Sequence, residues 1–236
     1  MAEFFVDVWH GNLAGVQGRL AELRQCLSDA EQERANALGN EVARARFIAG
    51  RGMLRAILAD YLCCHPRTVQ LELGEHGKPL LADRAFSFNL SHSADYWVLA
   101  VSNLETVGVD VETVRSRSSL DGIARRCFSD AELVSWLGLA ADERQSVFYR
   151  LWTIKEAFVK AVGRGLALGL HHCEVDMVNY DGFSAVPADC GLASFWRAKE
   201  LPLGEGVRAA LVTPVHDYAF RCLTIKPEFL LSGSFS

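Results

Sequence analysis

The sequence predicts an α+β fold made of two similar α/β subdomains related by approximate two-fold symmetry, and three pairs of similar segments support this prediction. The members of each pair are separated by roughly half of the chain. The pairs are LSDAE (27–31) with FSDAE (128–132), VDV (6–8) with VDV (109–111), and FIAGRGMLRAI (47–57) with WTIKEAFVKAV (152–162). In the last pair Arg55 aligns with Lys160. Chance similarity competes with a duplication, because the matches are short and their offsets drift.

The order of elements is the same in each half. VDV alternates apolar and polar residues, as a half-buried strand does. Ser28 with Glu31, and Ser129 with Glu132, form capping boxes that begin helices. A long amphipathic helix and further strands follow each of them. We therefore expect an N-terminal subdomain at 1–105 and a C-terminal subdomain at 106–236, with a ligand site where they meet.

Composition excludes several classes of protein. The chain has 236 residues, of which 50% are hydrophobic and 22% charged, which is ordinary for a globular protein. The net charge of −5 argues against general nucleic-acid binding. No apolar run reaches the ~20 residues that span a bilayer, and the N-terminal stretch lacks a basic region. Seven cysteines without a C-x-x-C pair fit a reducing compartment better than disulfides or zinc. We expect a cytoplasmic protein.

Two carboxylates share one face of the predicted strand in TVGVDVETV (106–114). Asp110 and Glu112 are two residues apart, so their side chains project together while Val109 and Val111 point the other way. The two charges repel unless a cation lies between them. Mg²⁺ suits such oxygen ligands. A solvated edge strand with two surface acids is the alternative.

Charged residues also interrupt the apolar helix in LWTIKEAFVKAVGRGL (151–166). Trp152, Glu156 and Lys160 follow each other at four-residue spacing and form one stripe. Lys155 is about 100° away and could reach the same ligand from the side. A surface ion pair is the alternative, although the rest of the helix leaves little free surface. The pattern favours a site for a polyanion and a metal.

Further polar features indicate the same kind of ligand. Ser91-His92-Ser93 interrupts an apolar stretch, where hydroxyl and amide groups could bind phosphate. Lys78 is fixed in a turn between Gly77 and Pro79. On the first long helix, one stripe carries Arg44, Arg51 and Arg55, and Arg46 lies on another face. Each of these features has an ordinary structural explanation when taken alone.

Taken in order, HGKPLL, FNLSHS, VGVDVE and LWTIKEAFVKAVGRGL resemble the successive motifs of the surfactin-type 4′-phosphopantetheinyl transferases. The resemblance extends from about residue 44 to 170. It implies a pseudo-dimeric α+β fold. It also implies transfer of phosphopantetheine from coenzyme A to a serine of an acyl or peptidyl carrier protein, releasing adenosine 3′,5′-bisphosphate. Mg²⁺ would be required, and Mn²⁺ could replace it.

The resemblance also implies roles for individual residues. The expected catalytic residues are Glu156, Lys160 and Asp110, and the expected metal ligands are Asp110, Glu112 and Glu156. The expected phosphate contacts are Lys155, Lys160 and His92. The adenosine 3′-phosphate end would be lined by Arg46, Lys78, Pro79 and Ser91. Residues 1–105 would thus bind the nucleotide, and residues 106–236 would hold the metal, the catalytic helix and the carrier contact. Glu156 is the candidate general base.

The resemblance leaves two regions open. Some members of the family place lysines ahead of the first long helix, where this chain has Glu31, Glu33 and Arg34. After about residue 172 no motif is assigned. Because carrier proteins are commonly acidic, we expect a basic patch formed by Arg115, Arg117, Arg125 and Arg126 or around Arg164. We expect a monomer that binds neither nucleic acid nor membrane. The alternative functions are a Mg²⁺-dependent phosphoanhydride hydrolase and a non-catalytic binding module.

Overall fold

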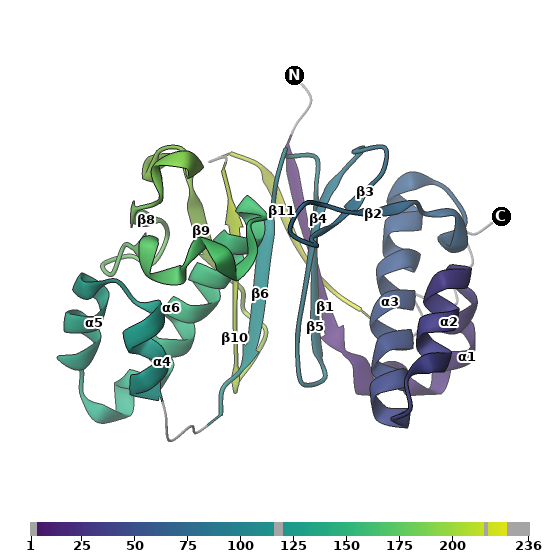
Figure 1. Ribbon diagram of the computed structural model, residues 1–236, viewed down its shortest axis with the longest axis horizontal. Helices are drawn as coiled ribbons and strands as arrows, with labels where there is room; N and C mark the ends of the chain where they lie inside the picture. The colour runs from purple at the N-terminus through teal and green to yellow at the C-terminus, as the bar shows by residue number, and fades with distance from the viewer. Residues whose placement is uncertain (1–3, 116–119, 215–216, 226–236) are drawn as a thin grey trace.

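The computed structural model describes residues 4–115, 120–214 and 217–225. Two β-sheets stand face to face in the middle of the molecule, and each is covered on its outer face by a long helix (Figure 1). These helices are α3 (Glu41–Leu62) and α6 (Ala141–Val162). The α+β class predicted from the sequence is confirmed. Two-fold symmetry between the halves and their division at 105/106 stay predictions.

The first sheet has the strand order β11-β1-β5-β4. Its strands are β1 (Phe5–Asn12), β4 (Ser87–Ser93), β5 (Tyr96–Ser102) and β11 (Ala219–Thr224). Strand β11 runs parallel to β1, and the other pairs are antiparallel. The sheet therefore contains a strand from the far end of the chain, and β4 forms its edge.

The second sheet is antiparallel, with the order β6-β10-β9. Its strands are β6 (Gly108–Thr113), β9 (Arg197–Glu200) and β10 (Val207–Thr213). Two small hairpins pair β2 (Leu71–Leu73) with β3 (Pro79–Leu81), and β7 (Glu174–Val175) with β8 (Phe183–Ala185). Strand β6 forms the edge of the second sheet that lies beside β4 (Figure 1).

Shorter helices complete the two outer layers. The α-helices are α1 (Leu20–Gln25), α2 (Asp29–Ala37), α4 (Leu120–Cys127) and α5 (Asp130–Leu137). The 3₁₀ turns are η1 (Leu13–Arg19), η2 (Pro66–Thr68), η3 (Gly165–Leu168), η4 (Leu170–His172), η5 (Ala188–Cys190) and η6 (Ala193–Phe195). Both predicted capping boxes are present, at Ser28 and Ser129. In the described ranges no helix is long and apolar enough to cross a bilayer.

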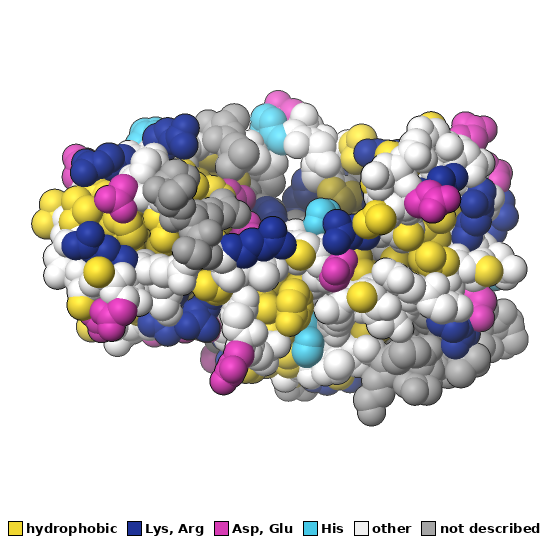
Figure 2. Space-filling model, turned by 90° about the horizontal axis from the view of Figure 1, so that it is seen from below, with side chains coloured by type: hydrophobic (Ala, Val, Ile, Leu, Met, Phe, Trp, Pro, Cys, Tyr) yellow, Lys and Arg dark blue, Asp and Glu magenta, His cyan; other side chains and the backbone are white. Residues whose placement is uncertain are grey.

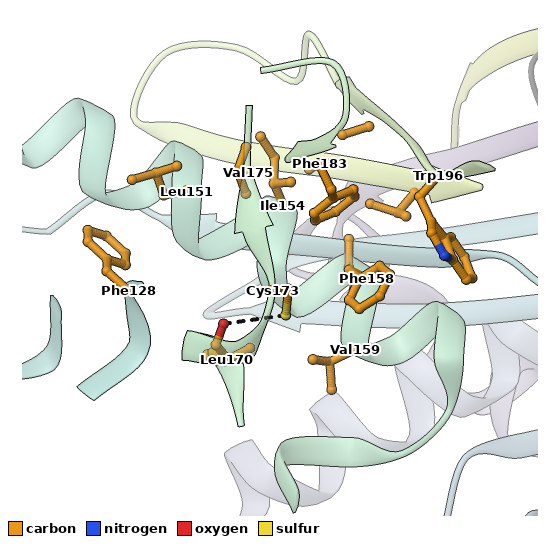
Figure 3. Packing of buried hydrophobic residues seen from close by; sticks show 14 of the residues in the cluster. Phe128, Leu151, Ile154, Phe158, Val159, Leu170, Cys173, Val175, Phe183 and Trp196 are labelled. Carbon is orange, nitrogen blue, oxygen red and sulfur yellow. Dashed lines mark hydrogen bonds between the residues drawn. The ribbon is translucent and has the colours of Figure 1, made fainter. Parts of the chain in front are cut away.

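Three hydrophobic clusters hold the layers together. One lies between α3 and the first sheet, and a second lies between the two sheets. The third surrounds α6, where Phe158 packs against Phe183 and Trp196 (Figure 3). Val109 and Val111 of β6 belong to the middle cluster. Because neighbouring residues of a strand face opposite ways, residues 108, 110 and 112 of β6 face α6.

Each long helix is tied to the capping box of its own half by a buried cation. Arg55 of α3 contacts Glu31, and Lys155 of α6 contacts Glu132. Both helices have 22 residues. The structure therefore aligns Arg55 with Lys155, which corrects the alignment of Arg55 with Lys160 that the sequence suggested. The alignment error has a physical cause. Lys155 and Lys160 lie on the same helix, and they differ only in their partners, which are Glu132 of α5 and Asp110 of β6.

Helix α6 packs unusually close to β6 at Gly108. A Cβ atom at this position would lie 2.0 Å from the carbonyl oxygen of Ala157 and 2.4 Å from the amide nitrogen of Ala161. Both neighbours are backbone atoms of α6, so no side chain could rotate out of the way. Only glycine permits this approach, which brings the α6 side chains over the strand.

We expect Gly108→Ala to separate α6 from β6 and to lower the free energy of unfolding by about 1–3 kcal/mol or more, because overpacking against backbone cannot relax. Urea unfolding followed by circular dichroism measures the loss. Gly122→Ala in α4 is the matched control, since nothing lies within 4 Å of its added methyl group. That variant should be as stable as the parent or slightly more stable. Equal stability of Gly108→Ala and the parent would contradict the close contact.

Candidate active site

Side chains, not backbone, join β4 to β6. Three residues at alternate positions of β4 project toward β6, because residues two apart share a face of a strand. Each accepts a hydrogen bond from a backbone N–H group of β6, and these contacts close the edge of the second sheet. The pairs are Asn89 Oδ1 with Val109 N at 2.9 Å, Ser91 Oγ with Val111 N at 3.3 Å, and Ser93 Oγ with Thr113 N at 3.1 Å.

A buried carboxylate lies at the centre of this joint. Asp110 Oδ1 accepts hydrogen bonds from Ser91 Oγ at 2.8 Å and from Lys160 Nζ at 2.6 Å. Lys160 Nζ also donates to Ser91 Oγ at 2.8 Å. The second oxygen, Oδ2, is buried and has no hydrogen-bond partner. Burial raises the pKa of Asp110, and the Lys160 charge opposes part of that shift. The structure thus brings together three of the residues predicted from the sequence.

Two further carboxylates lie beside Asp110. Glu112 Oε2 accepts a hydrogen bond from Ser93 Oγ at 2.8 Å. Glu156 lies one turn before Lys160 on α6. Burial raises the pKa of Glu156 to about 7, and the charges of Asp110 and Glu112 add to that shift while Lys160 opposes it. Each of these charges is therefore close enough to act on Glu156. The cluster holds three acids and one ammonium group.

Two cavities flank this cluster. The first, of about 530 Å³, is lined by Arg34, Arg46, Arg51, His92 and apolar side chains of α3 and β5. The second, of about 230 Å³, lies between the β2–β3 hairpin and α6 and is lined by Lys78, Pro79, Asn89 and Lys160. Leu90 borders both cavities. Figure 2 shows Lys, Arg and His side chains around a hollow in the middle of one face. An elongated anion could extend from one cavity to the other across the edge of β4.

The two neighbouring residues Ser91 and His92 face different parts of the site. Ser91 is buried against Asp110, whereas His92 is exposed and lines the first cavity. This difference follows from the alternation of side chains along β4. Strand β4 therefore lies between the carboxylate cluster and the first cavity. One face of the strand carries Ser91 toward the cluster, and the other carries His92 toward the cavity.

The arginines of α3 have different roles. Arg46 lines the first cavity and forms a half-exposed ion pair with Asp95, at 2.9 Å. Arg51 and Arg55 both pair with Glu31. Arg55 also donates to the carbonyl oxygen of Val69 at 3.0 Å. The stripe predicted from the sequence thus serves mainly to attach α3 to the start of α2.

The Lys78 ammonium group points into the protein. Its Nζ donates to the carbonyl oxygens of Val107 at 3.2 Å and Ala161 at 3.4 Å, and lies 3.5 Å from the Thr106 hydroxyl. Burial lowers the pKa of Lys78 to about 8. The contacts attach the β2–β3 hairpin to the end of α6, a structural role that the sequence did not indicate. Pro79 follows and lines the second cavity.

The structure corrects the expectation that Lys155 contacts phosphate. Its side chain is 0% exposed and pairs with Glu132, which is also 0% exposed. Lys155 Nζ donates as well to the carbonyl oxygen of Cys173 at 2.6 Å. Glu132 in turn accepts hydrogen bonds from Ser129 N and Val175 N. A rotation of about 100° on the helix directs Lys155 into the core of the second half, away from the carboxylate cluster.

The comparisons with known proteins agree with this arrangement. A family model described as the 4′-phosphopantetheinyl transferase superfamily matches residues 106–212, and a model of the N-terminal part of a 4′-phosphopantetheinyl transferase matches residues 15–104. The chain is 35% identical to 4′-phosphopantetheinyl transferase HetI of Nostoc sp. over 210 residues, which covers 87% of this chain and 86% of the relative. This chain belongs to the 4′-phosphopantetheinyl transferase superfamily.

Other relatives show the same relationship over shorter lengths. A putative 4′-phosphopantetheinyl transferase of Synechocystis sp., slr0495, is 34% identical over 75% of this chain and 72% of its own length. The 4′-phosphopantetheinyl transferase Sfp of Bacillus subtilis is 30% identical over 61% of this chain and 63% of its own length. The chain is therefore a transferase enzyme, and the family resemblance predicted from its motifs is confirmed.

Sequence reasoning missed three residues around the site of this phosphopantetheinyl transferase. Asn89 and Ser93 join β4 to β6, and Glu132 holds Lys155. For the first two a signal was present, because they alternate with Leu90 and His92 in FNLSHS and so share a face with Ser91. Glu132 was predicted only as a helix cap. Its second role depends on packing between α5 and α6, which the sequence does not reveal.

We expect Lys155→Met to lower the free energy of unfolding by about 3–5 kcal/mol, because it leaves the Glu132 charge buried and unpaired. The folded fraction should bind coenzyme A, the donor that the family resemblance implies, as the parent does, measured by calorimetry at low temperature. Lys160→Met is the matched control, because Lys160 is 28% exposed. It should change stability less and affinity more. A Lys155→Met enzyme that is stable but binds coenzyme A weakly would restore the phosphate role for Lys155.

Proposed function

We propose that this transferase moves 4′-phosphopantetheine from coenzyme A to a serine of an apo acyl or peptidyl carrier protein, with Mg²⁺ as the required cation and Mn²⁺ as a substitute. One observation carries the proposal. Lys160, which lines the second cavity, binds Asp110, with Glu112 and Glu156 beside it, and Leu90 borders both this cavity and the first. A long anionic substrate fits this path, with its pyrophosphate next to the ammonium group and the carboxylates.

The residues present fit a divalent cation that prefers oxygen ligands. The Oδ2 atom of Asp110 is buried without a hydrogen-bond partner, and burial, together with the charges of Asp110 and Glu112, raises the pKa of Glu156. In the described parts of the chain, no three His, Cys, Asp or Glu side chains are arranged so that they could hold a metal ion together. Mg²⁺ usually keeps several waters and completes its shell with substrate phosphates, so its protein ligands need not form a closed group before the substrate binds. Asp110, Glu112 and Glu156 are the proposed ligands.

The protein's own groups would orient and activate the substrate. Lys160 would bind the pyrophosphate and stabilise the charge that develops on the leaving oxygen. Bound Mg²⁺ would add to the stabilisation of that charge. Arg46 and His92, in the wall of the first cavity, would bind the nucleotide end and its 3′-phosphate, and Pro79, in the wall of the second, would make apolar contact with the substrate. Ser91, which is hydrogen-bonded to both Asp110 and Lys160, would hold these two side chains in position.

Glu156 is the proposed acceptor of the proton from the carrier serine. A base works best when its pKa lies near the working pH, and the pKa of Glu156 is raised to about 7. Its side chain is half-buried on α6, one turn before Lys160, where the proposed substrate would lie. A bound cation would lower this pKa and weaken the base, so transfer through a water molecule to Glu156 is part of the proposal.

The carrier protein would approach the second half of the molecule. Arg125 and Arg126 at the end of α4 are exposed and line a third cavity of about 610 Å³, whose wall also contains His171, Asp130 and Glu174. Arg115 is exposed as well, and Arg117 lies outside the described residues. Arg164 is paired with Asp189. A basic surface at the end of α4 would attract an acidic carrier and raise its association rate.

The proposal predicts that apo carrier protein incubated with this enzyme, coenzyme A and Mg²⁺ gains the mass of one phosphopantetheine group. Intact-mass spectrometry with fatty-acid and peptidyl carriers measures it, and EDTA should abolish the gain. Lys160→Met should slow transfer by roughly 10²-fold, because it removes charge stabilisation from the transition state. A Glu156→Ala variant with full activity would overturn the metal assignment.

Other outcomes of this assay identify the alternatives. Consumption of coenzyme A without any gain in carrier mass would indicate a phosphoanhydride hydrolase. Binding of coenzyme A without consumption would indicate a non-catalytic module. Either result would reject carrier modification as the activity of this chain.

Reversal of charge at Arg125 and Arg126 tests the carrier surface. We expect the double variant, with Glu at both positions, to raise the KM for carrier by roughly tenfold at low salt, because rim charges govern encounter rates. The KM for coenzyme A and kcat should not change. Arg84→Glu, an exposed change in the first half, is the control. An unchanged carrier KM in the double variant would reject this docking surface.

A further inference from the structure

The Ser93 hydroxyl connects the strand joint to one of the three carboxylates. Its oxygen accepts a hydrogen bond from Thr113 N at 3.1 Å and donates to Glu112 Oε2 at 2.8 Å. Asn89, at the other end of the joint, accepts a hydrogen bond from the backbone of β6 in the same ladder. Ser93 therefore does two things at once: it holds two strands together, and it fixes the direction of an acid.

We propose that Ser93 is a positioning residue that holds the Glu112 carboxylate in place for a divalent cation. This inference rests on the proposed function, because it concerns the same carboxylate cluster. Ser91 performs the parallel task for Asp110, since its hydroxyl donates to Oδ1 of that acid at 2.8 Å. Two serines on one face of β4 thus each hold one carboxylate on one face of β6.

Charge repulsion explains why Glu112 needs such a partner. Glu112 is half-buried at the end of β6 and lies on the same face of the strand as Asp110, which faces α6 and Glu156. Without a donor, a long flexible side chain repelled by two other acids would turn toward solvent. The Ser93 hydrogen bond opposes that rotation before any cation binds. Partners of this kind typically change metal affinity by about 10–100-fold.

A purely structural role for Ser93 is the competing explanation, and the chain offers a control for it. The Thr113 hydroxyl donates to the Ser93 carbonyl oxygen at 3.3 Å, which is a further link between β4 and β6 at the same place. Thr113→Val removes this link and leaves the Ser93 hydroxyl intact. It therefore weakens the joint without removing the donor to Glu112.

The experiment measures binding of Mn²⁺ to the full-length protein, from the free-ion signal in electron paramagnetic resonance, with coenzyme A present and no carrier protein. We expect Ser93→Ala to weaken Mn²⁺ binding by about tenfold or more. Ser93→Thr, which keeps the hydroxyl group, should bind Mn²⁺ like the parent. Thr113→Val should also keep the parent affinity even if it unfolds earlier in urea. Ser93→Cys, which supplies only a weak donor of similar size, is the second test if Ser93→Ala does not fold.

Each outcome separates this inference from the proposed function. Parent-like Mn²⁺ affinity in Ser93→Ala would overturn the inference, even if transfer slowed, because Ser93 would then serve only the strand joint. Equal losses of affinity in Ser93→Ala and Thr113→Val would overturn it as well. A parent enzyme that modifies carrier protein but binds no Mn²⁺ would also reject the inference and leave the transferase reaction standing. Weak Mn²⁺ binding in Ser93→Ala alone, with no carrier modified by the parent, would support the inference and reject the reaction.

Discussion

The close contact between α6 and β6 at Gly108 is the constraint on which the site depends. A strand and a helix normally keep the distance that their side chains set, and here the missing side chain allows backbone to meet backbone. Lys160 therefore reaches Asp110 while it is still part of a packed helix, 28% exposed. If α6 lay further from β6, the Lys160 ammonium group would have to extend across solvent, and Glu156 would lose the burial and the acidic neighbours that raise its pKa.

The electrostatics of the site follow from that proximity. Three acids and one ammonium group lie in a partly buried place, so the cluster carries excess negative charge. Hydrogen bonds from Ser91 and Ser93 stabilise two of the acids, but neutral donors do not remove the repulsion. The remaining imbalance favours either a proton on Glu156 or a bound cation. The same imbalance is why this cluster suits a cation-dependent reaction on an anionic substrate.

Local sequence signals predicted the parts of the fold that depend on neighbouring residues. The capping boxes at Ser28 and Ser129, and the common face of Asp110 and Glu112, each follow from spacing alone. Contacts between segments that are distant in the sequence were harder to predict. Lys155 and Lys160 look equivalent in a helical pattern, and only Glu132, from another helix, distinguishes the buried lysine from the one in the site.

The placement of β11 and of Lys78 could not be predicted for a related reason. Strand β11 comes from near the end of the chain and pairs with β1, so the first sheet contains strands from both halves of the sequence. The Lys78 side chain finds its acceptors at the start of β6 and the end of α6. Both contacts depend on how the two sheets meet, and no local pattern encodes that.

The paired VDV segments show how similar strands can serve different ends. Asp7 of β1 and Asp110 of β6 both face the long helix of their own half, because the valines on either side pack between the sheets. Asp7 is 0% exposed, and both of its oxygens have partners, from Tyr61 and Arg221. In Asp110, Oδ1 accepts a hydrogen bond from Lys160, whereas Oδ2 has no hydrogen-bond partner. A fully paired carboxylate stabilises the attachment of β11, whereas a carboxylate with a free oxygen can bind a cation. The difference between a structural acid and a candidate catalytic acid therefore lies in what the surrounding elements leave unpaired.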